Sequence, residues 1–179
     1  MTLYTHLDGP LGYLLLTSQG DRLTGLYFAD RSHAPEIGGD WVEEPNASIF
    51  LQTQEQVDEY MAGERETFDL PLSCSGTRFQ MQVWQEIVSI PFGQTISYTD
   101  LARRAVSTEA IRAVGMATGA NRISLIIPCH RVVGKNRSLI GYAGGMARKQ
   151  ALLEFEAARV QGHPAVLEMV EAEPALALV

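Results

Sequence analysis

The sequence Ile126-Ile127-Pro128-Cys129-His130-Arg131-Val132-Val133 brings a thiol, an imidazole and a guanidinium together directly after an apolar run. A cysteine attacks as the thiolate, and at an ordinary pKa of roughly 8.5 only a small fraction of the thiol is ionised at neutral pH. A neighbouring base or cation raises that fraction, so Cys129 is a candidate nucleophile with His130 beside it. A small buried cysteine followed by a solvated turn would show the same local pattern. The rest of the chain is needed to choose between these two interpretations.

The bulk composition narrows the class of protein. The chain has 179 residues, 46% of them hydrophobic, which is enough to bury a core in one domain or two small ones. No apolar run approaches the length of a membrane span, and the N-terminus lacks the pattern of a secretory signal. Cys74 and Cys129 form no disulfide framework, and with four scattered histidines they lack the spacing of a zinc site. We therefore expect a cytoplasmic protein with no metal, no cofactor and no membrane partner.

Charge is distributed unevenly along the chain. The formal net charge is −7, but residues 1–75 carry −10, residues 76–150 carry +7 and residues 151–179 carry −4. A polyanion responds to the face that it meets rather than to the sum over the chain. The middle segment can therefore bind DNA or RNA although the whole protein is acidic.

The N-terminal part has the pattern of strands followed by a helix. The apolar runs 13–17 and 23–28 flank a turn candidate and predict short antiparallel strands, and residues 30–45 predict a polar loop. Apolar residues at helical spacing predict a helix over 47–61, which Gly63 ends. This part of the chain is therefore expected to be a small α/β unit.

A linker predicted over residues 69–76 separates this unit from the next. We accordingly expect an N-terminal domain at 1–75, a C-terminal domain at 76–160 and an acidic tail at 161–179. The tail is rich in alanine, with a possible helix over 166–170, and its sequence indicates no chemistry.

The C-terminal part has helical texture. A helix capped by Thr77 is predicted, with an apolar face made by Phe79, Val83, Trp84, Ile87 and Val88. Shorter helices predicted over 98–105 and 109–120 resemble a helix-turn-helix, although many helix pairs without a nucleic-acid role share that pattern. The second of them is rich in Ala and Gly, which would let its backbone approach a narrow groove. A strand is predicted over 125–127, and a last helix over 146–159.

Several motifs in this part occur together in a fixed order. They are Phe79-Gln80, Val83-Trp84, Ile90-Pro91-Phe92-Gly93, Ser97-Tyr98, Leu101-Ala102, Arg112-Ala113-Val114-Gly115, Asn121, Pro128-Cys129-His130-Arg131-Val132, Gly141-Tyr142-Ala143-Gly144-Gly145, Lys149 and Leu152-Leu153-x-x-Glu156. With these motifs the chain resembles the O6-alkylguanine-DNA alkyltransferase family (methylated-DNA–protein-cysteine methyltransferases) over roughly residues 77–156. The N-terminal 70 residues match in outline only. The resemblance implies a ribonuclease H-like α/β N-terminal domain, with a small antiparallel sheet and a helix. A mostly α C-terminal domain with a helix-turn-helix is expected to follow it.

The resemblance implies a one-use DNA-repair protein. Members of the family bind the minor groove, flip O6-alkylguanine out of the duplex and move the alkyl group irreversibly to the cysteine, because O6 of a stacked base is out of reach. The expected partner is double-stranded DNA containing O6-alkylguanine, with O4-alkylthymine as a further candidate. A monomer acting at the nucleoid is expected, without a cofactor.

Roles follow position by position from the same resemblance. Cys129 corresponds to the nucleophile and alkyl acceptor, His130 to the base that takes the thiol proton through a water, and Glu156 to the carboxylate that orients this base. Asn121 corresponds to the residue that braces the hinge before the active site. Tyr98 corresponds to the tyrosine that assists flipping and can donate a proton to the leaving guanine.

The remaining expected site residues fall into two groups. Arg112 corresponds to the arginine that fills the gap left by the flipped base, and further DNA contacts are expected from Tyr98, Ala113, Arg122 and Arg131. The guanine pocket is expected to be lined by Val132, Tyr142, Ala143, Gly144 and Lys149.

The chain departs from the family at four places, one of which is a tail beyond Glu156 that is acidic rather than basic. Arg122 stands where the family commonly has proline, the turn over 106–109 lacks the usual Gly-x-Pro, and the N-terminal domain lacks the Cys and His ligands with which some members hold zinc. We therefore predict no zinc here.

Other classes of function stay open at this point. A non-catalytic helix-turn-helix protein could bind alkylated DNA and signal to other factors, although such relatives lack the cysteine. A regulator whose methylated cysteine signals would need a further domain. A cysteine hydrolase could use Cys129, His130 and Glu156, but it would explain neither the basic segment nor the small-residue helix.

Overall fold

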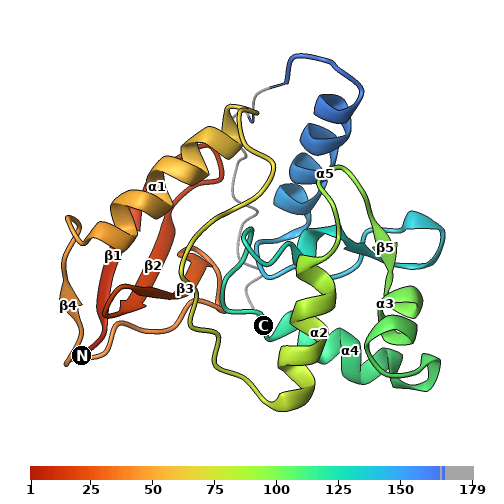
Figure 1. Cartoon of the computed structure of the whole chain (residues 1–179), viewed down its shortest axis with the longest axis horizontal. Coiled ribbons are helices and arrows are strands. Elements are labelled where there is room, and N and C mark those ends of the chain that lie inside the picture. The colour runs from red at the N-terminus through yellow and green to blue at the C-terminus, as the bar shows by residue number, and fades with distance from the viewer. Residues whose placement is uncertain (166, 168–179) are drawn as a thin grey trace, which may run out of the picture.

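The structure, a computed structural model, describes residues 1–165 and Leu167 (Figure 1). The helix predicted over 166–170 lies outside the described residues, apart from Leu167, which is buried and not helical. No helix in the described part of the chain is long and apolar enough to cross a membrane.

The N-terminal part is a four-stranded sheet covered by a helix. Its elements are β1 (Leu3–Leu7), β2 (Leu14–Gln19), β3 (Arg22–Phe28), β4 (Val42–Glu43) and α1 (Ser48–Met61). The strand order is β3-β2-β1-β4, with antiparallel pairs except for β4, which lies parallel to β1. The expected α/β fold is confirmed, but the sheet is mixed. The predicted loop over 30–45 adds an edge strand because its backbone amides reach the carbonyl groups beside β1.

Helix α1 lies across one face of this sheet (Figure 1). Its inward residues share one face at helical spacing and are buried: Ile49, Phe50, Thr53, Val57, Tyr60 and Met61. All of them except Thr53 belong to the same apolar cluster as strand residues such as Leu14, Leu16 and Leu26. Removing each large side chain from water contributes about 1.5–3 kcal/mol, so this contact holds the helix in place.

The C-terminal part is mainly helical. It comprises α2 (Arg78–Val88), β5 (Ile96–Ser97), α3 (Tyr98–Ala105), α4 (Ile111–Gly119), β6 (Val132–Val133) and α5 (Met146–Val160). Thr77 caps α2 as predicted: its hydroxyl accepts from the amide of Gln80, whose side chain bonds back to the amide of Thr77. The predicted apolar face is wrong at its last residue, since Val88 is 54% exposed at the helix end.

Helices α2, α3 and α4 pack together at one end of the molecule (Figure 1). The indole of Trp84 donates to the carbonyl oxygen of Ala117 at 2.8 Å, which ties α2 to α4. Arg103 and Arg104 lie on the exposed side of α3, as the spacing predicted. A 3-10 turn over Thr108–Ala110 leads into α4, so the second helix of the pair begins two residues later than predicted.

The predicted strand over 125–127 is wrong. Residues 124–127 form turns, Leu125 has a φ of 70°, and the nearest strand-like contact is an isolated bridge between Leu26 and Ile123. The apolar run reflects burial rather than strand pairing. The side-chain oxygen of Asn121 accepts a hydrogen bond from the amide of Ile123, and its side-chain nitrogen donates to the carbonyl oxygen of Ile127. These two bonds close the segment into a loop.

The two halves of the chain share one continuous core. At the junction, Arg148 of α5 donates from Nε to the carbonyl oxygen of Leu11 at 2.7 Å and forms an ion pair with Asp30 at 3.0 Å. A parallel bridge between Leu26 and Ile123 adds a second contact. Residues from the N-terminal half can therefore reach the C-terminal site.

Candidate active site

Cys129 begins a short 3-10 turn, Cys129–Arg131, between Pro128 and β6. The amide nitrogen of the Asn121 side chain donates to Sγ of Cys129 at 3.2 Å and to the carbonyl oxygen of Ile127 at 2.9 Å. Asn121 is itself buried. One side chain thus braces the loop before the turn and also holds the thiol in place.

The thiol of Cys129, the candidate nucleophile, is protonated at rest. Its burial raises its pKa, because a thiolate is poorly solvated in the interior, while the hydrogen bond from Asn121 and the charge of Lys149 lower it in part. The thiol therefore needs a base at the moment of attack.

His130 is placed to be that base. Its side chain is fully buried, and Nε2 lies 2.8 Å from Oε1 of Glu156. Burial lowers the pKa of the imidazole, which favours the neutral form. Since an ionised carboxylate only accepts, Nε2 carries the proton and Nδ1 keeps its lone pair. Nδ1 is buried and has no hydrogen-bond partner among the described residues, so it is free to receive a proton.

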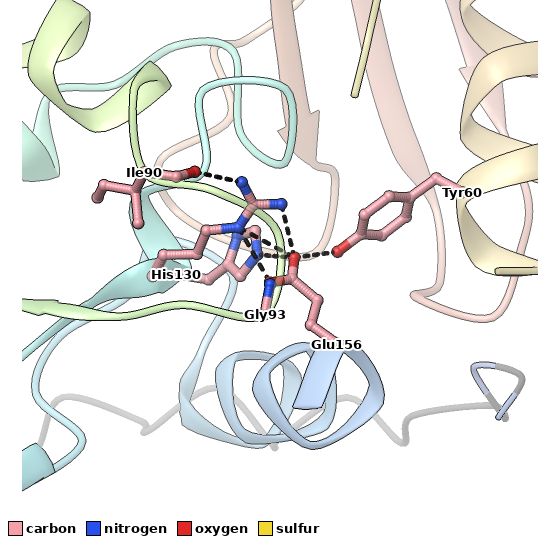
Figure 2. Close-up of polar contacts among 6 residues, drawn as sticks. Tyr60, Ile90, Gly93, His130 and Glu156 are labelled. Atoms are coloured by element: carbon pink, nitrogen blue, oxygen red, sulfur yellow. Dashed lines mark hydrogen bonds and ion pairs between the residues drawn. The ribbon is translucent and has the colours of Figure 1, made fainter. Parts of the chain in front are cut away.

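Glu156 on α5 is the centre of a buried polar network (Figure 2). Its Oε1 accepts from the hydroxyl of Tyr60 at 2.6 Å, from His130 and from Nη2 of Arg131 at 2.9 Å. Its Oε2 accepts from the amide of Gly93 at 2.9 Å and from Nε of Arg131 at 3.0 Å. Burial alone would raise its pKa, but the hydrogen bonds and charges of His130 and Arg131 lower the pKa to about 2. Glu156 is therefore ionised and can stabilise a positive charge on His130.

Arg131 does not face a DNA-binding surface, and the predicted contact with DNA is wrong for this residue. Only 5% of it is exposed, and its guanidinium binds both oxygens of Glu156. Nη1 donates to the carbonyl oxygen of Ile90 at 2.7 Å, and the group lies over the ring of Phe92. The planar guanidinium of Arg131 matches the two oxygens of a carboxylate, so the buried charge of Glu156 holds this side chain in the protein interior.

Lys149 lies behind the pocket rather than in its wall, which corrects the prediction for this residue. Its ammonium group is buried and donates to the carbonyl oxygens of Val132 at 2.6 Å, Ile140 at 2.8 Å and Gly141 at 3.2 Å. Burial lowers its pKa to about 8, so it stays charged at neutral pH. Lys149 thus ties the loop that carries Tyr142 to β6. Val132 is likewise fully buried, with its carbonyl group occupied by this bond.

Gly144 is a buried residue that supports the pocket from behind. A Cβ there would lie 2.5 Å from the ring of Phe28 and 2.6 Å from that of Tyr142. Its carbonyl oxygen accepts from Arg148 at 3.0 Å. Glycine is therefore required for the loop to pack this closely on β3.

A cavity of about 250 Å³ opens at the thiol. Its walls include Tyr98, Thr118, Gly119, Cys129, Tyr142 and Ala143. Burial, together with Cys129, raises the pKa of Tyr98 to about 12, so this phenol keeps its proton and can donate it. Burial also raises the pKa of Tyr142, whose buried hydroxyl has no partner among the described residues. The cavity thus joins the thiol of Cys129 to two protonated phenols.

Sequence reasoning missed several residues at this site. His33, in the loop after β3, lies at the wall of the cavity. Tyr60 and Gly93 bind the carboxylate of Glu156. Nothing local in the sequence marks these positions as functional. Gly93 stood inside a quoted motif, but its backbone amide could not be assigned a partner.

The exposed side of α4 carries the predicted DNA contacts. Arg112 and Ala113 are exposed there, whereas Val114 faces the core. Gly115 and Gly119 leave open space where side chains would stand. Arg122, also exposed, borders a different hollow of about 640 Å³ between α4 and the N-terminal sheet. The structure therefore separates Arg122 from the cavity at the thiol.

Comparison with known proteins gives consistent matches over both halves of the chain. Residues 78–158 match the family described as 6-O-methylguanine DNA methyltransferase, DNA binding domain, and residues 2–74 match its ribonuclease-like domain. The methylated-DNA–protein-cysteine methyltransferase of Mycobacterium leprae is 43% identical over 84% of this chain and 89% of its own length. The constitutive enzyme of Bacillus subtilis is 41% identical over 86% of this chain and 93% of its own.

Solved structures agree with these matches. A crystal structure of Mycobacterium tuberculosis OGT in complex with DNA has a TM-score of 0.82 and 40% identity, covering 91% of this chain and 96% of that one. Most of the length of both domains is thus shared with relatives of one kind. This chain belongs to the methylated-DNA–protein-cysteine methyltransferase family.

Proposed function

We propose that this protein repairs DNA by direct reversal, moving the alkyl group from O6 of guanine to Sγ of Cys129 in a single, irreversible turnover. The observation that carries this proposal is the buried thiol at the cavity, backed by a free imidazole nitrogen and an ionised carboxylate. Membership of the family supports the same reaction.

The proposed reaction is an in-line displacement at the alkyl carbon. The thiol proton passes through a water molecule to Nδ1 of His130, and Glu156 stabilises the imidazolium that forms. Sγ of Cys129 then bonds to the alkyl carbon, while the carbon–O6 bond breaks and its electron pair goes to the guanine. Tyr98 donates a proton to the departing base, because guanine leaves more easily as a neutral molecule. Tyr98 and His130 then exchange protons with solvent, and the thioether remains.

The substrate has to enter the cavity as a flipped base. The thiol is only 4% exposed, so a guanine stacked in a duplex cannot reach it. Extrusion costs a few kcal/mol of stacking and pairing. The small residues of α4 would let this helix approach the minor groove, and Arg112 on its exposed side would occupy the gap left in the stack. O4-alkylthymine carries its alkyl group on an exocyclic oxygen in the same manner and is a second candidate substrate.

Mass measurement of the intact chain tests the reaction. Incubation with duplex DNA containing O6-methylguanine should add one methyl group to Cys129 and no more than one per chain. The matched control is the same duplex with unmodified guanine, which should add none. Several turnovers per chain, or no modification, would contradict the proposal.

Replacing Arg112 by alanine is expected to separate flipping from chemistry. Repair of O6-methylguanine in duplex DNA should slow by about ten-fold or more, because no side chain then fills the gap that the flipped base leaves in the stack. A ten-fold loss corresponds to about 1.4 kcal/mol for the interaction of Arg112 with the unstacked DNA. Reaction with free O6-benzylguanine, which needs no flipping, should keep its native rate. Arg22→Ala removes one exposed positive charge from β3 and serves as the control. Equal losses on the two substrates would argue against a role in flipping.

We also propose that the protein acts as a single chain per lesion in the cytoplasm, at the nucleoid. The substrate proposed above, DNA, supports this location. Labelling the chain in cells and following its distribution before and after alkylation tests it, and recovery with the membrane fraction would contradict it.

A further inference from the structure

Tyr60 reaches from the N-terminal half of the chain into the active site of the C-terminal half. Figure 2 shows its side chain coming from α1 toward the carboxylate of Glu156 on α5. Its hydroxyl donates to Oε1 at 2.6 Å, and this is the same oxygen that lies 2.8 Å from Nε2 of His130. Three side chains thus bind this oxygen: Tyr60 comes from α1, and His130 and Arg131 come from the turn after Pro128.

We propose that Tyr60 is a positioning residue for alkyl transfer: its hydroxyl holds Oε1 of Glu156 against His130 and limits the negative charge that this oxygen presents to the imidazole. The proposal rests on the function proposed above and assigns part of that function to the N-terminal domain.

The surroundings of Tyr60 explain why its hydroxyl, and not only its ring, matters. The ring is fully buried and contacts Phe68, Phe92 and Phe155 with centroid separations of 5.4, 5.8 and 5.6 Å. Phenylalanine would fill the same space without the cost of burying a hydroxyl group, which is about 1–3 kcal/mol if unpaired. The hydroxyl is therefore useful only through the carboxylate of Glu156, its one hydrogen-bond partner among the residues that the structure describes.

The hydroxyl is a permanent donor. Burial, and the neighbouring negative charge of Glu156, raise the pKa of Tyr60 well above 10. It therefore stays protonated throughout the range in which the histidine titrates. Each donor to a carboxylate oxygen withdraws charge from it, and so weakens its attraction for a neighbouring imidazolium.

Removing the hydroxyl of Tyr60 should change the pKa of His130 in a definite direction. Over all the elements packed around them, the other ionisable groups that face His130 or Glu156 are Cys129, Arg131, Tyr142 and Lys149. A Tyr60→Phe variant keeps all of these and removes one donor from Oε1. The oxygen becomes more negative and stabilises the imidazolium, so the pKa of His130 rises toward its ordinary value. A larger fraction of the base is then already protonated in mildly acidic solution.

The test is the pH dependence of single-turnover transfer to the full-length protein from duplex DNA with O6-methylguanine. In the Tyr60→Phe variant the acid limb should move to higher pH by about half a unit or more. Phe68→Leu, which loosens the ring cluster but keeps the hydroxyl bond, should leave the acid limb where it is. Incorporation of 3-fluorotyrosine at position 60, a stronger donor, should move the limb to lower pH.

Three results would overturn the proposal. One is an unchanged acid limb in Tyr60→Phe, with rates lowered by the same factor at every pH. The second is an equal shift in Phe68→Leu, which would assign the effect to packing. The third is a shift to higher pH with fluorotyrosine. Failure of the native protein to accept a methyl group at all would instead refute the proposed function, so the two failures are distinct.

Discussion

Replacing Cys129 by serine is expected to abolish alkyl transfer completely while binding to alkylated DNA persists. A serine hydroxyl is far harder to ionise than a thiol, and the neutral imidazole of His130 is too weak a base to deprotonate it. The serine side chain is close in shape to cysteine and can still accept a hydrogen bond from Asn121, so the fold and the cavity should be preserved.

Two measurements on matched variants check this expectation. Intact mass reports transfer, and fluorescence anisotropy with a labelled duplex reports binding. The control is Cys74→Ser, which changes the other cysteine, a half-buried residue outside the site. Cys74→Ser should still accept one methyl group. Retained transfer in Cys129→Ser would place the acceptor elsewhere. A native protein that bound alkylated DNA without ever transferring the methyl group would favour the binding-only alternative.

Replacing Glu156 by alanine is expected to damage both stability and chemistry. The change leaves the guanidinium of Arg131 buried without a counter-charge and the hydroxyl of Tyr60 without its acceptor. Breaking a buried pair in this way costs about 3–5 kcal/mol of unfolding free energy. Transfer should slow by about a hundred-fold or more in the protein that remains folded, because His130 loses the group that stabilises its charged form.

Urea unfolding and single-turnover kinetics check the two effects. Glu154→Ala, which removes an exposed carboxylate from the same helix, should change stability by less than about 0.5 kcal/mol. The native protein should also lose stability as the pH falls from about 4.3 to 2, because the folded-state pKa of Glu156 is about 2 and protonation favours the unfolded chain. This loss should be smaller in Glu156→Ala. A variant as stable and as fast as native would remove Glu156 from the proposed mechanism.

Local features of the fold were predictable because they depend on neighbours in the chain. Thr77 caps α2 through a residue three positions away, and the apolar spacing of residues 49–61 places α1 on the sheet. The short helix over 98–105 begins and ends as predicted, since Ser97 caps it and Val106 leaves the helical conformation. In each case the sequence signal that predicts the element lies within the element or next to it.

The wrongly predicted strand over 125–127 has a cause that lies outside its own residues. The run at 125–127 looked like a strand because apolar residues can be buried in any conformation. Its true conformation depends on Asn121, whose amide takes the hydrogen bonds that a neighbouring strand would otherwise make. Apolar periodicity reports burial and not backbone pairing.

The chemistry of the site divides in the same way. The sequence itself shows that Cys129 and His130 are adjacent, and its motifs carry the family resemblance that pairs them with Glu156. The position of the Arg131 side chain could not be predicted from the sequence, because the partners that hold it, Ile90 and Glu156, lie 41 and 25 residues away along the chain. Sequence alone therefore predicted Cys129 as the nucleophile and His130 as its base, whereas tertiary packing turned an expected DNA contact into a buried counter-charge. It also brought Tyr60, 96 residues from Glu156, to the carboxylate, since buried polar groups must find partners wherever the fold places them.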